Sequence, residues 1–222
     1  MTIRSTGGHV AAYAWLVFAA LNIADLAIGI TGEADYSLMT LGIGMVLLLG
    51  CGIAYTVGLR PAIVGDDEAV TVRNPLREAR VPWGAVRGIE GGNAVAVRFT
   101  GPDGTELQTR AWVHQTSPRA QAKAEARARK EESKTPGIDL RGRTPAAYAA
   151  QRLNEILDRQ RPKTRSGAPD KAAAAKAESG KAKSAAGGEP VRGTVRWSVP
   201  AVASLAVPAA VLVVLAVVGA VT

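Results

Sequence analysis

The sequence predicts a membrane protein with three transmembrane α-helices and a small cytoplasmic α+β domain, in which a C-terminal helix follows an antiparallel sheet. Three observations lead to this fold class. The apolar residues gather in three long blocks, although their 47% share of the whole chain is ordinary for a globular protein. Between the second and third blocks, apolar and polar residues alternate with the period of a β-strand. An amphipathic stretch with helical spacing follows the alternating region.

The three apolar blocks are predicted to be transmembrane helices at residues 10–30, 38–59 and 197–221. Each block reaches the roughly 20 apolar residues that span a bilayer. The second and third contain no charged residue, and a chain of 222 residues is too short to bury such helices in a soluble core. The first block has no clean cleavage site behind it, so a helical hairpin is favoured over a signal peptide.

Charge predicts the orientation of these helices. Arg4 is the only one of the 27 basic residues that precedes Arg60, and the connection Thr31–Ser37 carries Glu33 and Asp35 but no basic residue. Basic residues near helix ends favour the cytoplasmic side. We therefore expect a multi-pass protein of the cell membrane, with the N-terminus and the sheet domain cytoplasmic and the C-terminus external.

Residues 60–116 are predicted to form the sheet, with about six short strands. Val70 and Val72 share one face of a strand, as do Val95, Val97 and Phe99 in a later one. Turn-forming runs such as GDDE, GGN and GPDG separate the alternating segments. Because so small a sheet has a thin core, we expect a helix to cover it.

The run RPAIVGDDEAVTVRNPLREARVPWGAV, which starts at Arg60, resembles the bacterial PH-like domain of the low-molecular-weight protein antigen 6 family. The similarity extends through VRFTGPDGTELQTRAW and covers roughly residues 60–115. The resemblance implies a PH-like sheet attached to membrane helices, with no enzymatic activity and no settled ligand. It also implies that Trp83, in the Pro-Trp pair, packs in the structural core.

Three segments follow the sheet. Residues 117–143 form a polar, charged insertion that suits either a solvated helix or disorder. Residues 144–161 are predicted to be an amphipathic helix that closes the domain, with Ala149, Leu153, Ile156 and Leu157 on its apolar face. Residues 162–195, rich in Ala, Lys and Gly, are predicted to be a disordered basic linker.

The net charge of +8 comes from the region after the sheet rather than from the sheet itself. Anionic lipids of the inner leaflet are therefore one expected partner of the basic tail, and a linker kept soluble by its charge is the alternative. Arg73, Arg77 and Arg80 flank the NPL turn and are candidate ligand or lipid contacts. No nucleic-acid partner is expected, because the basic stretches lack interleaved aromatic residues.

Residue content argues against several other classes of site. With Cys51 as the only cysteine and His9 and His114 as the only histidines, we predict no catalytic constellation, no metal site and no cofactor. Asp25 is the one ionisable residue inside an apolar block, and Asn22 lies on the same helical face. This pair is a candidate intramembrane polar contact, with helix–helix hydrogen bonding, interfacial exposure and ion handling all open.

These observations predict an integral membrane protein whose cytoplasmic PH-like domain is a non-enzymatic binding or scaffolding module for lipid or for an unknown protein partner. The alternative is an accessory subunit of a transporter or envelope-assembly complex that acts through its transmembrane helices.

Overall fold

The computed structural model describes residues 1–32, 34, 36–113, 145–160 and 191–221. It divides into two compact units. The helical unit comprises Ser5–Pro61, Asn74–Glu78 and Arg196–Thr222, and the sheet unit comprises Met1–Arg4, Ala62–Arg73 and Ala79–Val195. The predicted insertion 117–143 and most of the predicted linker 162–195 lie outside the described residues, as do Glu33 and Asp35.

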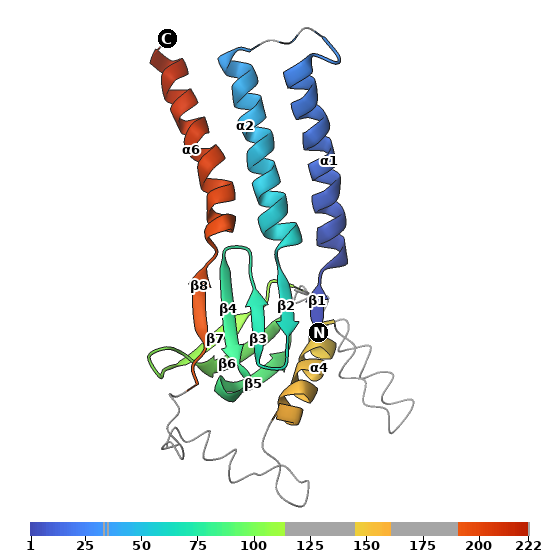
Figure 1. The fold of residues 1–222 in the computed structure, drawn as a ribbon, viewed down its shortest axis with the longest axis vertical. Helices are drawn as coiled ribbons and strands as arrows, with labels where there is room; N and C mark the ends of the chain where they lie inside the picture. Colours follow the sequence, from blue (N-terminus) through green and yellow to red (C-terminus); the bar gives the residue numbers. More distant parts are fainter. Residues whose placement is uncertain (33, 35, 114–144, 161–190, 222) are drawn as a thin grey trace, which may run out of the picture. The chain divides into compact units, whose positions relative to one another are not determined.

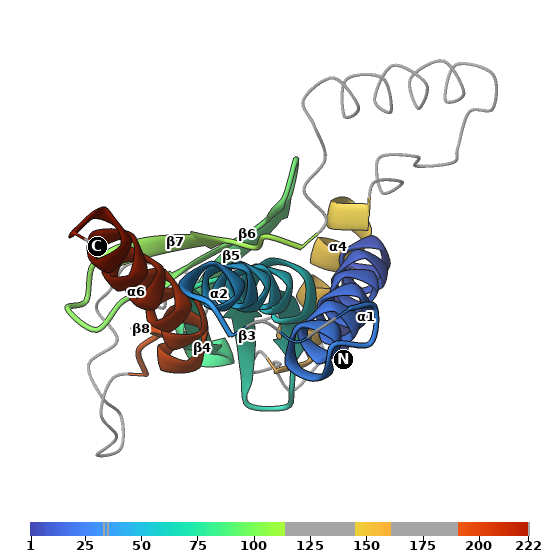
Figure 2. The same ribbon diagram turned by 90° about the horizontal axis from the view of Figure 1, so that it is seen from above.

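The helical unit contains three helices that are long and apolar enough to cross a membrane. They are α1 (Thr6–Ile28), α2 (Leu38–Ile53), which continues as a π-helix over Ala54–Leu59, and α6 (Val199–Val221). The helices run side by side, and α2 lies between α1 and α6 (Figures 1 and 2). The predicted group of three spanning helices is therefore present.

Capping residues decide where the first two helices begin and end. Ser5 caps α1 by accepting a hydrogen bond from the Gly8 amide, so the helix begins four residues before the predicted span. Gly29 ends it in the left-handed conformation, with φ of 71°. Ser37 caps α2 by accepting from the Thr40 amide at 3.3 Å.

Glycines allow the three helices to approach closely. A Cβ atom on Gly52 would lie 2.3 Å from the carbonyl oxygen of Ser204 in α6, and one on Gly58 would lie 2.6 Å from the Cβ of Ala12 in α1. Small residues at such crossings are the usual basis of packing between membrane helices. Gly42 and Gly44, in contrast, face open space.

The sheet unit is built from two antiparallel sheets. One has the order β1-β2-β3-β4-β8 and the other the order β5-β6-β7. The strands are β1 (Thr2–Arg4), β2 (Ala62–Gly65), β3 (Ala69–Arg73), β4 (Arg77–Pro82), β5 (Val86–Gly91), β6 (Val95–Thr100), β7 (Glu106–Arg110) and β8 (Thr194–Trp197). Six of them, β2 to β7, lie in the region predicted to form the sheet.

The core of this unit draws on both sheets and on helix α4 (Pro145–Gln160). Val70, Val72, Val97 and Phe99 are fully buried, as their alternation predicts. Helix α4 buries Ala146, Ala149, Ala150, Leu153 and Leu157 in the same cluster. A Cβ atom on Gly91 would lie 2.6 Å from the Cα of Ala147, so this glycine lets α4 lie directly on β5 (Figure 1). The antiparallel sheet and its following helix are therefore present.

Two strands lie outside the region predicted to form the sheet. Thr2–Arg4 pairs with Ala62–Val64 as β1, although the helical hairpin separates the two segments in the sequence. Thr194 and Val195, predicted to belong to the disordered linker, are in β8, and the Gly193 amide donates to Thr100 O at 2.9 Å. The prediction that residues 60–116 contain the whole sheet was therefore wrong. Three- and four-residue strands carry too little alternation to be seen in sequence, and they form because the sheet offers unpaired edges.

Candidate membrane-boundary site

Arg60 directly follows the π-helix at the end of α2. Its amide donates to Tyr55 O at 2.9 Å, which closes the last turn of that helix. Only 7% of its side chain is exposed. A buried guanidinium needs several acceptors, because it carries five N–H donors and stays charged.

The turn Asn74–Glu78 between β3 and β4 supplies these acceptors. The Arg60 guanidinium donates to the carbonyl oxygen of Asn74. It also donates to the carbonyl oxygens of Pro75 and Arg77, and both of these distances are 3.3 Å. It also forms an ion pair with Glu78 Oε2 at 3.4 Å. Arg60 therefore ties the turn to the end of a predicted spanning helix, within the helical unit.

The start of α6 holds the same turn from another direction. The amide of Ser198, one residue before α6, donates to Leu76 O at 2.8 Å. The guanidinium carbon of Arg77 lies 4.4 Å from the centre of the Trp197 ring, within the distance for a cation–π contact. We call Arg60, Asn74–Glu78, Trp197 and Ser198 the boundary site.

The three arginines predicted as ligand contacts have different surroundings. All three are exposed, but Arg77 belongs to the helical unit, whereas Arg73 and Arg80 belong to the sheet unit. Arg80 forms an exposed ion pair with Glu68 at 3.2 Å. Only Arg77 therefore lies in the boundary site.

Trp83 lies in the core of the sheet unit and is 6% exposed. Its indole Nε1 donates to Asp66 O at 2.8 Å, and its backbone amide donates to Glu68 O at 3.1 Å. The tryptophan thus fills the core and also holds the β2–β3 turn.

The carboxylate of Asp66 organises that same turn. Its Oδ1 accepts the amides of Ala69, at 2.6 Å, and Glu68, at 2.9 Å. These two hydrogen bonds favour the charged form and hold the pKa of Asp66 below its ordinary value.

Asn22 and Asp25 make local contacts near the end of α1. The Asn22 amide donates to Phe18 O at 2.7 Å, one turn earlier in the same helix. Asp25 accepts from the amide and the hydroxyl of Thr31, both at 2.8 Å. These hydrogen bonds stay within α1 and the chain just after it. In the part of the chain that the structure describes, neither side chain is hydrogen-bonded to another helix.

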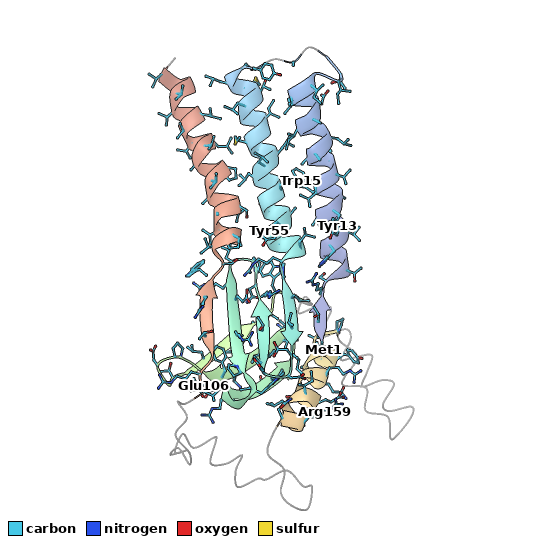
Figure 3. All side chains as sticks on the ribbon, in the orientation of Figure 1. Met1, Tyr13, Trp15, Tyr55, Glu106 and Arg159 are labelled. Carbon is cyan, nitrogen blue, oxygen red and sulfur yellow. The ribbon has the colours of Figure 1, made fainter. Side chains whose placement is uncertain are left out.

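An apolar groove of about 370 Å³ lies between α1 and the end of α2. Its lining residues are Gly8, Ala11, Ala12, Trp15, Gly50, Ile53, Ala54, Val57 and Gly58. Trp15 is on α1 (Figure 3). A Cβ atom on Gly50 would lie 2.3 Å from the Trp15 ring, so the ring covers this glycine closely. Gly50 and Ala54, four positions apart in the sequence, both line this groove.

Sequence reasoning missed Arg60, Trp197 and Ser198 as parts of a site. One signal was available, since Arg60 and the Arg196–Trp197 pair each stand at the end of an uncharged apolar block. Across the described residues, no group of three or more His, Cys, Asp or Glu side chains lies close enough to hold a metal ion.

Residues 60–131 match the family model of the bacterial PH domain. No curated protein and no solved structure matches the chain. The family match begins at Arg60, covers β2 to β7, and includes neither β1 nor α4. The chain therefore carries a bacterial PH-like domain, together with three helices that are long and apolar enough to cross a membrane.

Proposed function

We propose that the protein is a multi-pass membrane protein whose cytoplasmic PH-like domain is a non-enzymatic binding or scaffolding module for lipid or protein. PH domains are in general non-catalytic modules that bind lipids or proteins, which supports this class of function.

The observation that carries the proposal is that very short connections join the strands to the helices along the chain. Between β1 and α1 stands only Ser5, and between β8 and α6 only Ser198. The π-helix after α2 ends at Leu59, and β2 begins at Ala62. Connections this short attach the domain closely to the chain of all three helices, which suits a module that acts beside a membrane.

The charge at these junctions supports a cytoplasmic domain. Arg4, Arg60 and Arg196 stand beside the ends of the three helices that join strands, and the opposite connection Thr31–Ser37 has no basic residue. Basic residues close to the helix ends favour retention on the cytoplasmic side.

The groove between α1 and α2 favours the second candidate, an accessory subunit that acts through its helices. An apolar groove within spanning helices can receive a helix of another membrane protein. In that case the partners would depend on Trp15 and Gly50 rather than on the PH-like domain.

Cross-linking in intact cells, followed by capture of the tagged protein, separates the two candidates. The comparison uses the full chain, a chain with residues 62–195 replaced by a Gly/Ser linker, and a Trp15→Ala variant. Loss of the cross-linked partners in the linker variant alone supports the binding module. Loss in Trp15→Ala with retention in the linker variant supports the accessory subunit instead.

A further inference from the structure

Arg77 differs from Arg60 and Arg80 in what its guanidinium contacts. Arg60 is buried and paired with Glu78, and Arg80 is paired with Glu68. Arg77 is exposed, and no carboxylate of the described residues forms an ion pair with it. Its guanidinium lies instead over the ring of Trp197.

The backbone on both sides of this contact is held in place. Arg77 O accepts the Asn74 amide at 2.8 Å and the Arg60 guanidinium at 3.3 Å, and the Ser198 amide donates to Leu76 O at 2.8 Å. An arginine whose main chain is fixed and whose side chain rests on an aromatic ring loses less conformational freedom when it binds a ligand.

Trp197 locates this pair at the edge of a membrane-spanning segment. It is 59% exposed and stands two residues before α6, which begins at Val199 and contains no charged residue. Tryptophan is enriched at the level of the lipid headgroups, because its ring is apolar and its N–H is polar. The residues around the Arg77 guanidinium therefore fit a position among headgroups.

The electrostatics of this position favour an anion. Arg196 precedes Trp197, and the neighbouring carboxylate of Glu78 is engaged by Arg60. The N-terminal end of α6 adds a partial positive charge. A guanidinium stacked on a ring through its face keeps its N–H edges available for two parallel hydrogen bonds to phosphate oxygens.

We propose that Arg77 and Trp197 form a binding site for the phosphate of an anionic phospholipid at the start of α6. Arg77 donates to the phosphate oxygens, and Trp197 supports the guanidinium from its other side and packs against the glycerol and upper acyl region. The proposal rests on the proposed membrane attachment and names one lipid contact of the protein.

The test uses the full-length protein in detergent micelles, with bound phosphatidylglycerol and phosphatidylcholine measured by native mass spectrometry. Arg77→Gln and Trp197→Ala are compared with the parent and with Trp197→Phe, which keeps an aromatic face. Arg98→Gln is the matched control, since it removes the same charge from an exposed arginine paired with Glu90 at 2.8 Å.

Arg77→Gln is expected to weaken phosphatidylglycerol binding about tenfold, the effect of losing one charge-assisted hydrogen bond. Trp197→Ala is expected to weaken it as well, while Trp197→Phe and Arg98→Gln stay within about twofold of the parent. Glycerol 3-phosphate in millimolar excess is expected to leave the bound lipid in place, because it lacks the acyl chains.

Equal losses in Arg77→Gln and Arg98→Gln would overturn the proposal, since the effect would then be diffuse charge attraction. Unchanged lipid binding in Trp197→Ala would also overturn it, and this variant decides the question if Arg77→Gln does not fold. Loss of a cross-linked protein in Arg77→Gln with unchanged lipid binding would assign the arginine to a protein partner instead. Any of these results leaves the cross-linking test of the PH-like module untouched, so the two proposals fail separately.

Discussion

The guanidinium of Arg60 reaches Glu78 at 3.4 Å across 18 positions of sequence, and it donates on the way to three carbonyl oxygens of the Asn74–Arg77 turn. The buried Arg60 guanidinium thereby supplies hydrogen-bond donors to three carbonyl oxygens of this turn. This relationship connects the end of α2 with the β3–β4 turn and is the centre of the boundary site.

Replacing Arg60 should loosen this turn. Arg60→Gln removes the charge and most of the donors, and an unsatisfied buried group costs about 1–3 kcal/mol. We expect faster hydrogen exchange of the amides of residues 74–78 in the full-length protein, measured by mass spectrometry. Arg80→Gln breaks only an exposed ion pair and should change local stability by about 0.5 kcal/mol or less. Equal protection of residues 74–78 in Arg60→Gln and the parent would contradict this role.

Close packing of α2 on α6 should depend on Gly52. Gly52→Ala places a methyl group 2.3 Å from Ser204 O, and overpacking of this kind costs about 1–3 kcal/mol. We expect the thermal midpoint of the protein in micelles to fall by roughly 2–4 °C for each kcal/mol lost. Gly44→Ala is the control, because nothing lies within 4 Å of the added Cβ. A thermal midpoint as high for Gly52→Ala as for Gly44→Ala would contradict the dependence of α2–α6 packing on Gly52.

Trp83→Ala should destabilise the sheet unit strongly. The side chain is 6% exposed, and its removal from the core is expected to lower the free energy of unfolding by about 3–5 kcal/mol. Chemical denaturation of the full-length protein, followed by near-ultraviolet circular dichroism, measures the change. Trp83→Phe keeps most of the apolar contact but loses the hydrogen bond to Asp66 O, so its cost should be smaller. A Trp83→Ala protein as stable as the parent would place the tryptophan outside the core.

Asp66 should make the sheet unit sensitive to acid. Its pKa is lowered in the folded state by the Ala69 and Glu68 amides, so its carboxylate stabilises the fold at pH values above the unfolded pKa of about 3.9. This contribution is lost as the pH falls through the lower, folded pKa. The stability advantage of the parent over Asp66→Asn, measured by denaturation between pH 7 and pH 2.5, should therefore shrink in acid. An advantage that is constant over this range would exclude a charged carboxylate as its source.

The orientation of the chain is testable with single cysteines. In a protein whose Cys51 has been replaced by Ala, Ala34→Cys should react with a membrane-impermeant thiol reagent from outside the cell. Asp103→Cys, in the β6–β7 turn, should react only after the membrane is opened. Labelling of the Asp103→Cys protein in intact cells would reverse the proposed topology.

The pattern of apolar and polar residues was enough to predict the classes of secondary structure and most of their order. Long apolar blocks predict the three long helices, because a run of that length with at most one charged residue has few other stable environments. Alternation at Val70 and Val72 and at Val95, Val97 and Phe99 determined the strands that fill the core, since strict period-two patterns place one face inward. The amphipathic spacing around Leu153 likewise determined the helix that covers the sheet.

The distant segments that complete the sheet and the boundary site could not be predicted from the sequence and are seen only in the folded chain. The pairing of Thr2–Arg4 with Ala62–Val64 forms because a helical hairpin returns the chain to its own start. A strand of three residues is too short to show a β-strand pattern in the sequence. The stacking of Arg77 on Trp197 and the burial of Arg60 depend on the turn and two helix ends meeting in space. The periodicity of a segment shows which of its faces is apolar and which is polar. It does not show which other segment packs against the apolar face.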